Sequence, residues 1–459
     1  LPVLSSVLKL HNHKVYQLDL NLLAHTKLLS SQFLSLKIEQ IKKRFQQLDK
    51  QKSISSFAEL HEYEKLYDPV TLGDYLIENI DEAKKTIKNI NNYRFDEFGN
   101  SELLRHWQVF DLANKFLFFS PLLHPYLYQF EDSASCFMSV NQIQDVIKNP
   151  DKSIFYNFFQ DEVFPLILRK KPQIIGISLT FADQIIPTFL LSSTIKKEFP
   201  DCYVTIGGNI ISLLWREIKS QDILFDHVNS FVIGDGESAL LEMSNQFDKM
   251  NINLEKIPNI MYKRKKIVKN NHLVNWNISY SPPPDFSGLP LDDYFVGKRQ
   301  LVYMTGRGCY WGKCRFCDFS VTKPGYRSKS PKKIAQDLEY LSKTYNTKLF
   351  YMADDAIAPT KVWKIAEEIL NKNLNIDWWC LTRFDEGWTL NRLKTIKKAG
   401  CYRLFFGMES ANGRIQRFIN KGFTTEKINE VLNLLKKTNL HVHLSSIIGL
   451  PSETEKEAK

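Results

Sequence analysis

The apolar positions between residues 26 and 165 recur at the spacing of an α-helix. The clearest segment advances three or four residues at a time, through Leu34, Ile38, Ile41, Phe45 and Leu48. Similar patterns occur at 76–90 and 103–119, and glycine is scarce throughout. Such spacing places apolar side chains on one face of a helix. We therefore predict a helical insertion at 26–165, with its aromatic-rich segments 116–119 and 126–130 in the core.

On both sides of this insertion the pattern changes to an alternation of strands and helices. Continuous apolar runs, typical of parallel strands that are buried on both faces, occur at 174–179, 203–206 and 230–233. Helical patterns separate these runs, and residues 3–10 and 14–20 indicate a helix followed by a further strand. We therefore predict one open α/β domain formed by 1–25 and 166–270.

Glycine-bearing loops follow two of these strands, at Gly207-Gly208-Asn209 and from Gly234 to Glu237. In open α/β sheets, ligands bind beyond the carboxyl ends of the strands. Glycine at such a place lets a ligand come close to the backbone. Tight turns explain each loop about equally well, so each loop taken alone is a weak indication of a binding site.

A proline-rich stretch at 271–300 predicts a linker, because Pro282-Pro-Pro284 cannot enter a helix. Beyond it, residues 301–459 alternate between strands and helices again. Five strands are predicted, at 301–304, 349–353, 378–382, 403–406 and 441–448. The polar residues at their carboxyl ends include Asp354, Asp355, Arg383, Glu409 and Ser410. This pattern is typical of a (β/α) barrel whose active site faces that rim.

Three cysteines, Cys309, Cys314 and Cys317, lie in the loop that follows the first of these strands. A 4Fe-4S cluster held by three thiolates keeps one iron without a protein ligand, and that iron can bind a small molecule. The alternatives are a structural zinc site or cysteines that are close only by chance. Tetrahedral zinc would require a fourth Cys or His, and the loop contains none. The spacing therefore favours an iron–sulfur cluster.

This loop resembles that of radical S-adenosylmethionine (SAM) enzymes, in which Cys-x3-Cys-x2-Cys has an aromatic residue before the last cysteine. Phe316 occupies that position, whereas Tyr310 to Lys313 make the first gap four residues long. The resemblance covers 301–459 and implies a partial barrel. It implies that the cysteines hold the cluster and that SAM binds to Phe316 (adenine), Asp354 and Asp355 (amino group), Arg383 (carboxylate or sulfonium region), and Glu409 and Ser410 (ribose or backbone parts).

The α/β domain and the barrel together resemble cobalamin-dependent radical SAM proteins. This resemblance implies a flavodoxin-like cobalamin-binding domain. The implied cobalamin-binding residues are Ser178, Thr180, Gly207, Gly208 and Asn209 around the corrin, and Gly234, Gly236 and Glu237 near the nucleotide tail. No Asp-x-His-x-x-Gly motif is present, so we expect the cobalt to have no histidine ligand from the protein.

The composition, 43% hydrophobic and 13% aromatic over 459 residues, predicts a globular protein of two or three domains. The net charge of +10 is spread along the chain, so nucleic acid is not an expected partner. The densest basic run, 263–266, predicts an exposed hairpin turn. No apolar run approaches the roughly 20 residues of a membrane span, and no leader opens the chain, so we expect a cytoplasmic protein.

Four further cysteines, Cys136, Cys202, Cys380 and Cys401, are predicted to be buried thiols. The chain begins with half of a βαβ unit and stops within what resembles the next barrel helix, at 451–455. We therefore expect both ends to be truncated.

The leading functional interpretation is a cobalamin-dependent radical SAM methyltransferase. The resemblance implies reductive cleavage of SAM to a 5′-deoxyadenosyl radical and methylation of an unactivated carbon, in a natural-product or peptide-type substrate. It also implies an electron donor such as flavodoxin or ferredoxin. The alternatives are a cyclase or rearrangement enzyme that uses both cofactors, and a non-catalytic cofactor-binding sensor. An RNA methylthiotransferase would need cysteines for a second cluster, and the N-terminal part has too few. The sequence identifies no catalytic side chain.

Overall fold

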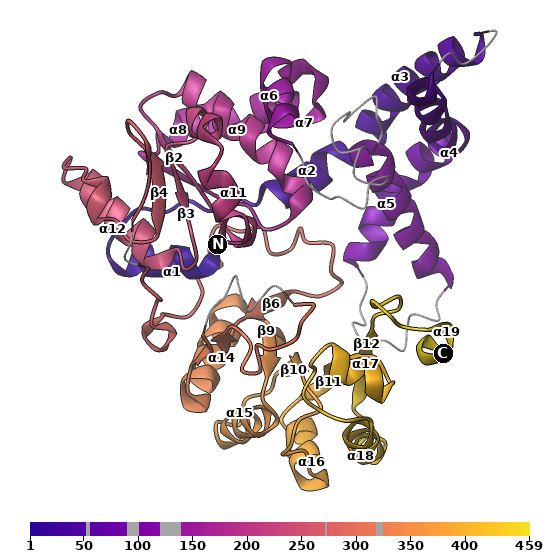
Figure 1. The fold of residues 1–459 in the computed structure, drawn as a ribbon, viewed down its shortest axis with the longest axis vertical. Coiled ribbons are helices and arrows are strands. Elements are labelled where there is room, and N and C mark those ends of the chain that lie inside the picture. Colours follow the sequence, from indigo (N-terminus) through magenta and orange to yellow (C-terminus); the bar gives the residue numbers. More distant parts are fainter. Residues whose placement is uncertain (52–55, 90–100, 120–138, 271–272, 318–324) are drawn as a thin grey trace. The chain divides into compact units, whose positions relative to one another are not determined.

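The computed structural model describes residues 1–51, 56–89, 101–119, 139–270, 273–317 and 325–459 (Figure 1). The chain divides into two compact units. The barrel unit contains Leu1–Val15, Asn275–Phe286 and Arg299–Lys459. The α/β unit contains Tyr16–Val274 and Ser287–Lys298. Residues 1–25, predicted as part of the α/β domain, are thus divided between the two units. The same holds for residues 271–300, predicted as a linker.

The α/β unit contains a five-stranded sheet. Its strands are β1 (Ile174–Ser178), β2 (Tyr203–Gly207), β3 (Ser230–Val232), β4 (Ile260–Lys263) and β5 (Ile267–Lys269). They lie in the order β1-β2-β3-β4-β5, with β1, β2 and β3 parallel and β4 and β5 antiparallel. The helices between the parallel strands are α9 (Ile185–Glu198), α10 (Asn209–Leu213) and α11 (Trp215–Lys219), and α12 (Glu237–Asp248) follows β3. The strands predicted at 174–179, 203–206 and 230–233 and the predicted basic hairpin turn are confirmed. The expected burial of the first of these strands on both faces is wrong, because β1 is an edge strand whose residues are half-buried or exposed.

The strand predicted at 14–20 is wrong. Residues 14–19 have no regular structure, and helix α2 (Leu20–Leu28) begins where the strand was expected to end. Asp19 caps this helix, since its side chain accepts a hydrogen bond from the backbone of Leu22. Tyr16 and Leu18 are 48% and 39% exposed, so their alternation serves no buried face. Within the described residues the sheet is therefore sequential, and it lacks the strand exchange of the predicted flavodoxin-like order.

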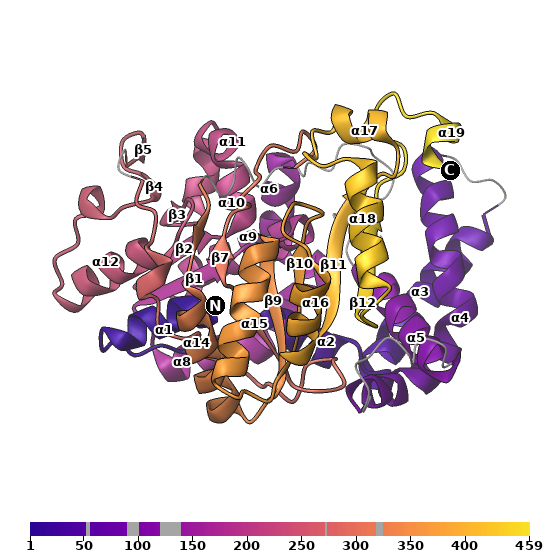
Figure 2. The same cartoon turned by 90° about the horizontal axis from the view of Figure 1, so that it is seen from below.

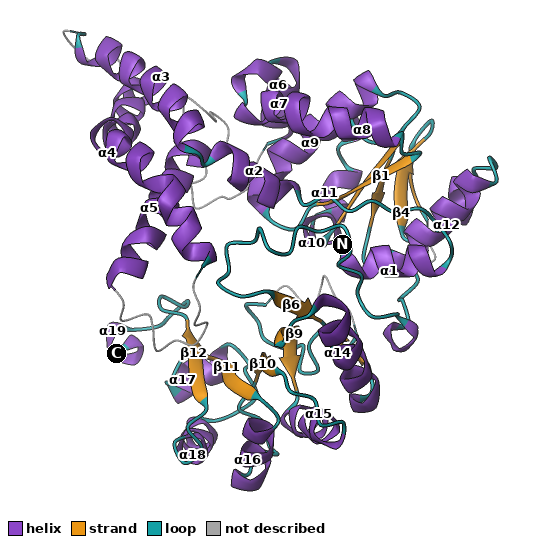
Figure 3. Cartoon of the chain, turned by 180° about the vertical axis from the view of Figure 1, so that it is seen from behind, coloured by secondary structure: helices purple, strands orange, loops and turns teal. Residues whose placement is uncertain are grey.

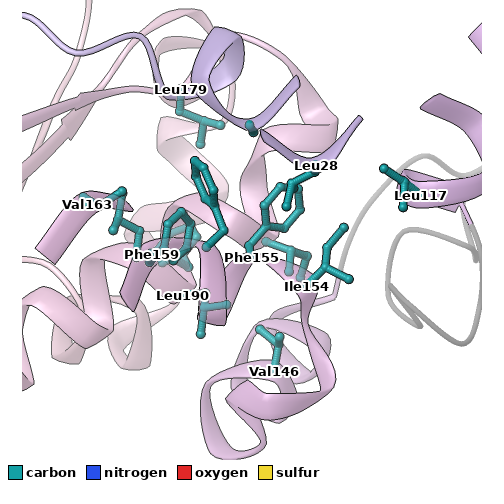
Figure 4. Close-up of a cluster of buried hydrophobic side chains, with 14 of the residues drawn as sticks. Leu28, Leu117, Val146, Ile154, Phe155, Phe159, Val163, Leu179 and Leu190 are labelled. Atoms are coloured by element: carbon teal, nitrogen blue, oxygen red, sulfur yellow. The ribbon is translucent and has the colours of Figure 1, made fainter. Parts of the chain in front are cut away.

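The described part of 26–165, predicted as a helical insertion, is helical (Figure 3). Its helices are α3 (Ser31–Asp49), α4 (Phe57–Lys88), α5 (Ser101–Phe119), α6 (Val140–Lys148), α7 (Ile154–Phe158) and α8 (Phe164–Lys170). Leu34, Ile38, Ile41 and Leu48 are buried, as their spacing predicts. Phe116 and Leu117 are buried too, whereas segment 126–130 lies outside the described residues. Figure 4 shows part of this unit's hydrophobic core around Phe155 and Phe159.

The barrel unit contains five parallel strands in the order β12-β11-β10-β9-β6. They are β6 (Gln300–Tyr303), β9 (Leu349–Ile357), β10 (Asp377–Thr382), β11 (Cys401–Glu409) and β12 (His441–Ser446). The connecting helices lie along one face of the sheet (Figures 1 and 2): α14 (Pro331–Tyr345), α15 (Pro359–Asn371), α16 (Leu390–Lys398) and α18 (Thr425–Leu435). All five predicted strands are confirmed.

The two faces of this sheet differ in burial. In β10, Trp378, Cys380 and Thr382 are buried and alternate with the half-buried Trp379 and Leu381. Trp378 Nε1 donates to the carbonyl of Ala399, just after α16, so the buried set faces the helices. We call the opposite, half-buried face the inner face.

The remaining elements of the barrel unit are short. They are α1 (Pro2–Leu10), β7 (Gly306–Arg307), β8 (Arg327–Ser328), α17 (Gly413–Phe418) and α19 (Glu455–Ala458). Cys202, Cys380 and Cys401 are buried thiols, as predicted, and Cys136 lies outside the described residues. Within the part of the chain that is described, no helix combines the length and the apolar character that a membrane crossing requires.

Candidate cofactor site

The cysteine loop begins directly after β7, near the carboxyl end of β6. Gly308 and Gly312, on either side of Cys309, have φ angles of +75° and +60°, which a residue with a side chain rarely adopts. The backbone N–H of Cys317 donates to the carbonyl of Cys314 in a tight turn. All three cysteines are half-buried, and none forms a disulfide in the described part of the chain. Three reachable thiols are thus gathered on one short loop.

The donor set fits an iron–sulfur cluster better than a single metal ion. Among the described residues, no three His, Cys, Asp or Glu side chains converge so as to hold one metal ion. A zinc site requires such convergence, because all of its ligands bind the same ion. In a 4Fe-4S cluster each thiolate binds a different iron, so the sulfur atoms remain further apart.

Asp354 and Asp355 lie in the carboxyl-terminal part of β9. The Asp354 carboxylate is buried and accepts hydrogen bonds from the backbone N–H and the hydroxyl of Thr305, each at 2.9 Å. Burial raises the pKa of Asp354 to about 6, although the hydrogen bonds from Thr305 and the nearby Lys361 oppose the rise. Asp355 is half-buried. The register between β9 and β10 is irregular in this part of β9.

Arg383, which directly follows β10, is buried, and protein groups surround its guanidinium. Nε and Nη2 donate to Asp385 at 2.9 and 3.1 Å, and Nη2 also donates to the carbonyl of Lys421 at 2.6 Å. The guanidinium lies 5.0 Å from the centre of the Trp311 ring, and the hydroxyl of Tyr310 donates to Asp385. Arg383 therefore joins the cysteine loop to the end of β10. The resemblance assigned it to SAM; its contacts in the structure are those of a residue that positions the loop.

Glu409 ends β11 with a φ of +68°, at a register irregularity between β11 and β12. A residue with a side chain in this conformation is strained, and such strain tends to occur at functional sites. Its carboxylate accepts from Lys421 Nζ at 2.8 Å and from the Ser445 hydroxyl at 3.3 Å. Ser410 is buried beside it, and its hydroxyl oxygen accepts from the backbone N–H of Asn412. The end of β11 thus carries a buried ion pair.

Phe316 is exposed, and Lys421 Nζ lies 5.5 Å from the centre of its ring. Lys421 therefore contacts both Phe316, which was predicted to pack against adenine, and Glu409, whose carboxylate was predicted to bind SAM. The sequence analysis missed Lys421 and Asp385. No periodic pattern indicates either residue, because their contacts depend on how distant loops come together in the fold.

In the α/β unit, the loops after β2 and β3 come together. The hydroxyl of Ser212 donates to the carbonyl of Gly208 and accepts from the backbone N–H of Gly234, at 3.0 and 2.9 Å. Gly208 has a φ of +110°, and a Cβ there would lie 2.3 Å from the carbonyl oxygen of Leu179. Gly234 has a φ of +76°, and a Cβ there would meet no described atom within 4 Å. Only the second loop leaves open space of the kind that a ligand could fill.

The other residues predicted to bind cobalamin lie at the same strand ends. Ser178 ends β1, and the backbone N–H of Thr180 donates to the Gln184 side chain at 3.0 Å. The remaining residues, at the end of β2, in the loop after β3 or at the first positions of the next helices, are Gly207, Asn209, Gly236 and Glu237. Glu237 is buried. The exposed Phe181, which the sequence analysis did not single out, directly follows Thr180.

Residues 303–459 match the family model of the radical SAM superfamily. The chain therefore carries a radical SAM domain in this part, and the superfamily implies a 4Fe-4S cluster and SAM as cofactors. The chain is also similar to several individual proteins.

A methyltransferase of Pyrococcus horikoshii, itself uncharacterized, is 29% identical over 310 residues, which are 65% of this chain and 65% of that protein. An anaerobic magnesium-protoporphyrin IX monomethyl ester cyclase of Synechocystis sp. is 25% identical over 265 residues, 54% of this chain and 50% of that protein. The structure of the cobalamin-dependent radical SAM enzyme OxsB, with aqua-cobalamin and SAM bound, aligns with a TM-score of 0.57 and 21% identity. That alignment covers 65% of this chain and 44% of the OxsB chain, and it shows a shared fold. The chain thus spans between 44% and 65% of the lengths of these proteins.

Proposed function

We propose that this protein is a cobalamin-dependent radical SAM enzyme that methylates an unactivated carbon of a natural-product or peptide-type substrate. The observation that carries the proposal is the joint placement of three half-buried cysteines on one loop and a strained, buried Glu409 at the end of β11. When bound, the cluster and SAM supply a 5′-deoxyadenosyl radical that abstracts hydrogen, and cobalamin supplies the methyl group.

The side chains of the barrel unit bind and orient SAM in this proposal. Cys309, Cys314 and Cys317 hold the cluster. Glu409 and Lys421 carry opposite charges 2.8 Å apart. The methionine half of SAM also carries two opposite charges, on its amino and carboxylate groups. A buried pair of this kind suits a zwitterionic ligand, because each ligand charge finds an opposite charge without water.

The exposed ring of Phe316 offers an apolar surface to adenine. Ser410 adds a hydroxyl beside Glu409. Asp355, half-buried near the carboxyl end of β9, is a second candidate, beside Glu409, for the amino group that the resemblance gave to both aspartates. Asp354 and Arg383 support the site by holding Thr305 and the cysteine loop in place.

Cobalamin is proposed for the strand ends of the α/β unit. The open space at Gly234 and its link through Ser212 to Gly208 support this assignment. The cobalamin bound in the OxsB structure adds support from a protein of shared fold. An electron donor such as flavodoxin or ferredoxin completes the proposed reaction.

A cyclisation without methyl transfer is the second candidate function. It is favoured by the likeness to anaerobic magnesium-protoporphyrin IX monomethyl ester cyclases, which include those of Synechocystis and Rubrivivax gelatinosus. Product analysis separates the two candidates, because a labelled methyl group from SAM enters the product only in methyl transfer.

The cluster is tested with a triple alanine variant of Cys309, Cys314 and Cys317. Anaerobically reconstituted wild-type protein should bind about four irons and show an electron paramagnetic resonance (EPR) signal that changes with SAM. The triple variant should bind none, and Cys202→Ala, which removes a thiol of the α/β unit, should retain them. Glu409→Gln keeps the backbone and the side-chain shape, so iron should stay while deoxyadenosine production falls. Iron retained by the triple variant would contradict the cluster assignment.

The cobalamin site is tested with Gly234→Asn. Asparagine tolerates a positive φ, and its side chain would enter the open space without meeting described protein atoms. Gly288→Asn is the matched control, because Gly288 also has a positive φ and no described atom within 4 Å. Wild type and Gly288→Asn should take up hydroxocobalamin with the spectrum of the base-off form, and Gly234→Asn should not. Wild-type protein that retains no cobalamin after gel filtration would refute the methyltransferase proposal.

A further inference from the structure

Trp311 lies within the four-residue gap between Cys309 and Cys314, where radical SAM enzymes usually have three residues. Its indole Nε1 donates to the carbonyl of Asn420 at 2.9 Å. A Cβ on Gly422 would lie 2.2 Å from the nearest ring carbon, so the indole rests directly on the backbone of Gly422. The lengthened gap thus directs one large side chain into the segment that follows α17.

Hydrogen bonds to the same segment hold Lys313 and Arg315, on the C-terminal side of Trp311. Asn420 Nδ2 donates to the carbonyl of Lys313 at 2.9 Å. The backbone N–H of Arg315 donates to the carbonyl of Ile419 at 3.0 Å, and Arg315 Nη1 donates to the carbonyl of Phe418 at 3.1 Å. Four hydrogen bonds and one ring contact therefore join residues 311–315 to residues 418–422. We call this set of contacts the loop clamp.

The loop clamp leads directly to the buried ion pair. Lys421, whose Nζ binds Glu409, lies between Asn420 and Gly422, the two residues that Trp311 contacts. The carbonyl of Lys421 accepts from Arg383, whose guanidinium lies 5.0 Å from the centre of the Trp311 ring. A shift of the indole would therefore disturb the cysteine loop and the backbone that carries Lys421 at the same time.

We propose that Trp311 is a positioning residue that fixes the cysteine loop relative to the Lys421–Glu409 pair, so that SAM bound by that pair reaches the open iron. This inference rests on the proposed function. A purely structural aromatic residue would stabilise the loop without affecting how the cluster senses SAM. The distinguishing readout is therefore the effect of SAM on the cluster, measured apart from iron content.

The test compares Trp311→Phe and Trp311→Ala with wild type in the anaerobically reconstituted full chain. Both variants should keep their iron and the SAM-free EPR signal. Trp311→Phe keeps a ring but loses one hydrogen bond, so the KM for SAM should rise about fivefold. Trp311→Ala should raise it further and weaken the change that SAM makes to the EPR signal. Gly422→Ala should act like Trp311→Ala, because its Cβ collides with the indole from the other side.

Trp378→Phe is the matched control. Trp378 also donates from Nε1 to a backbone carbonyl, at 2.8 Å, but its acceptor, Ala399, lies outside the loop clamp. This control should leave the KM for SAM unchanged. A wild-type KM and a wild-type SAM effect in both Trp311 variants would overturn the proposal. Loss of iron in Trp311→Phe would also overturn it, by making Trp311 a residue of cluster assembly. Failure of the proposed function is distinct, because wild-type protein itself would then bind no iron or show no response to SAM.

Discussion

Asp354→Asn should make the protein more stable at neutral pH. The Asp354 carboxyl is buried, and burial raises its pKa from the ordinary 3.8 to about 6. Well below pH 3.8 the group is protonated in both the folded and the unfolded state. As the pH rises from about 4 to 6, the unfolded chain releases the proton while the folded chain still binds it, so folding becomes less favourable.

The size of this effect follows from the displaced pKa. A tenfold change in proton affinity is worth about 1.4 kcal/mol, so the full penalty above pH 6 is about 3 kcal/mol. Between pH 5 and pH 7 the penalty grows by about 1 kcal/mol. Asparagine has no such titration. Its amide oxygen can accept from the Thr305 backbone and its amide group can donate to the Thr305 hydroxyl. The Gly306 backbone also donates to the Asp354 carboxylate, and in the variant only the amide oxygen can accept this bond.

The assay is urea denaturation of wild type and Asp354→Asn at pH 5 and pH 7, followed by circular dichroism. The advantage of the variant should be about 1 kcal/mol larger at pH 7 than at pH 5. Glu430→Gln, which removes an exposed carboxylate, controls for the loss of one negative charge. An advantage that is equal at the two pH values would refute the argument from burial. A loss of the SAM effect on the cluster in Asp354→Asn, with the iron intact, would instead return Asp354 to the SAM site.

Two further predictions concern buried contacts of the barrel unit. Lys421→Met should lower the free energy of unfolding, measured by urea denaturation, by about 3–5 kcal/mol, because it leaves the buried Glu409 carboxylate without its ionic partner. Adding Glu409→Gln should recover part of this loss. Equal losses in the single and double variants would contradict the pairing. Gly400→Ala should lower the melting temperature by several degrees, because its Cβ would lie 1.8 Å from the carbonyl oxygen of Ile376 at a φ of +87°. An unchanged melting curve would show that this loop rearranges freely.

The apolar runs allowed most of the fold to be predicted from the sequence. Strands with buried residues, such as 203–207 and 349–357, need continuous or alternating apolar residues, and few helices imitate them at that length. The strand predicted at 14–20 failed because a short alternation is ambiguous. The side chain of Asp19 caps and stabilises a helix that begins at Leu20.

The candidate site was predictable in its residue types but not in its contacts. The pairing of Glu409 with Lys421 could not be predicted, because a helix and a loop separate the two residues and no sequence pattern shows how that loop returns to β11. The same holds for Arg383, whose acceptor is a carbonyl 38 residues away.

The barrel unit is assembled from three stretches of chain that are far apart in the sequence. Helix α1 is attached to the stretch 275–286 through Asp285, which accepts from the Ser5 hydroxyl and pairs with Lys9, each at 2.7 Å. Phe286 in turn is held by the Tyr345 hydroxyl at 2.8 Å. A fragment cut at residue 303, where the family match begins, would lose the first two stretches and β6, an edge strand of the sheet. We expect such a fragment to aggregate when expressed alone, because the exposed edge of β9 would offer free backbone groups to other chains.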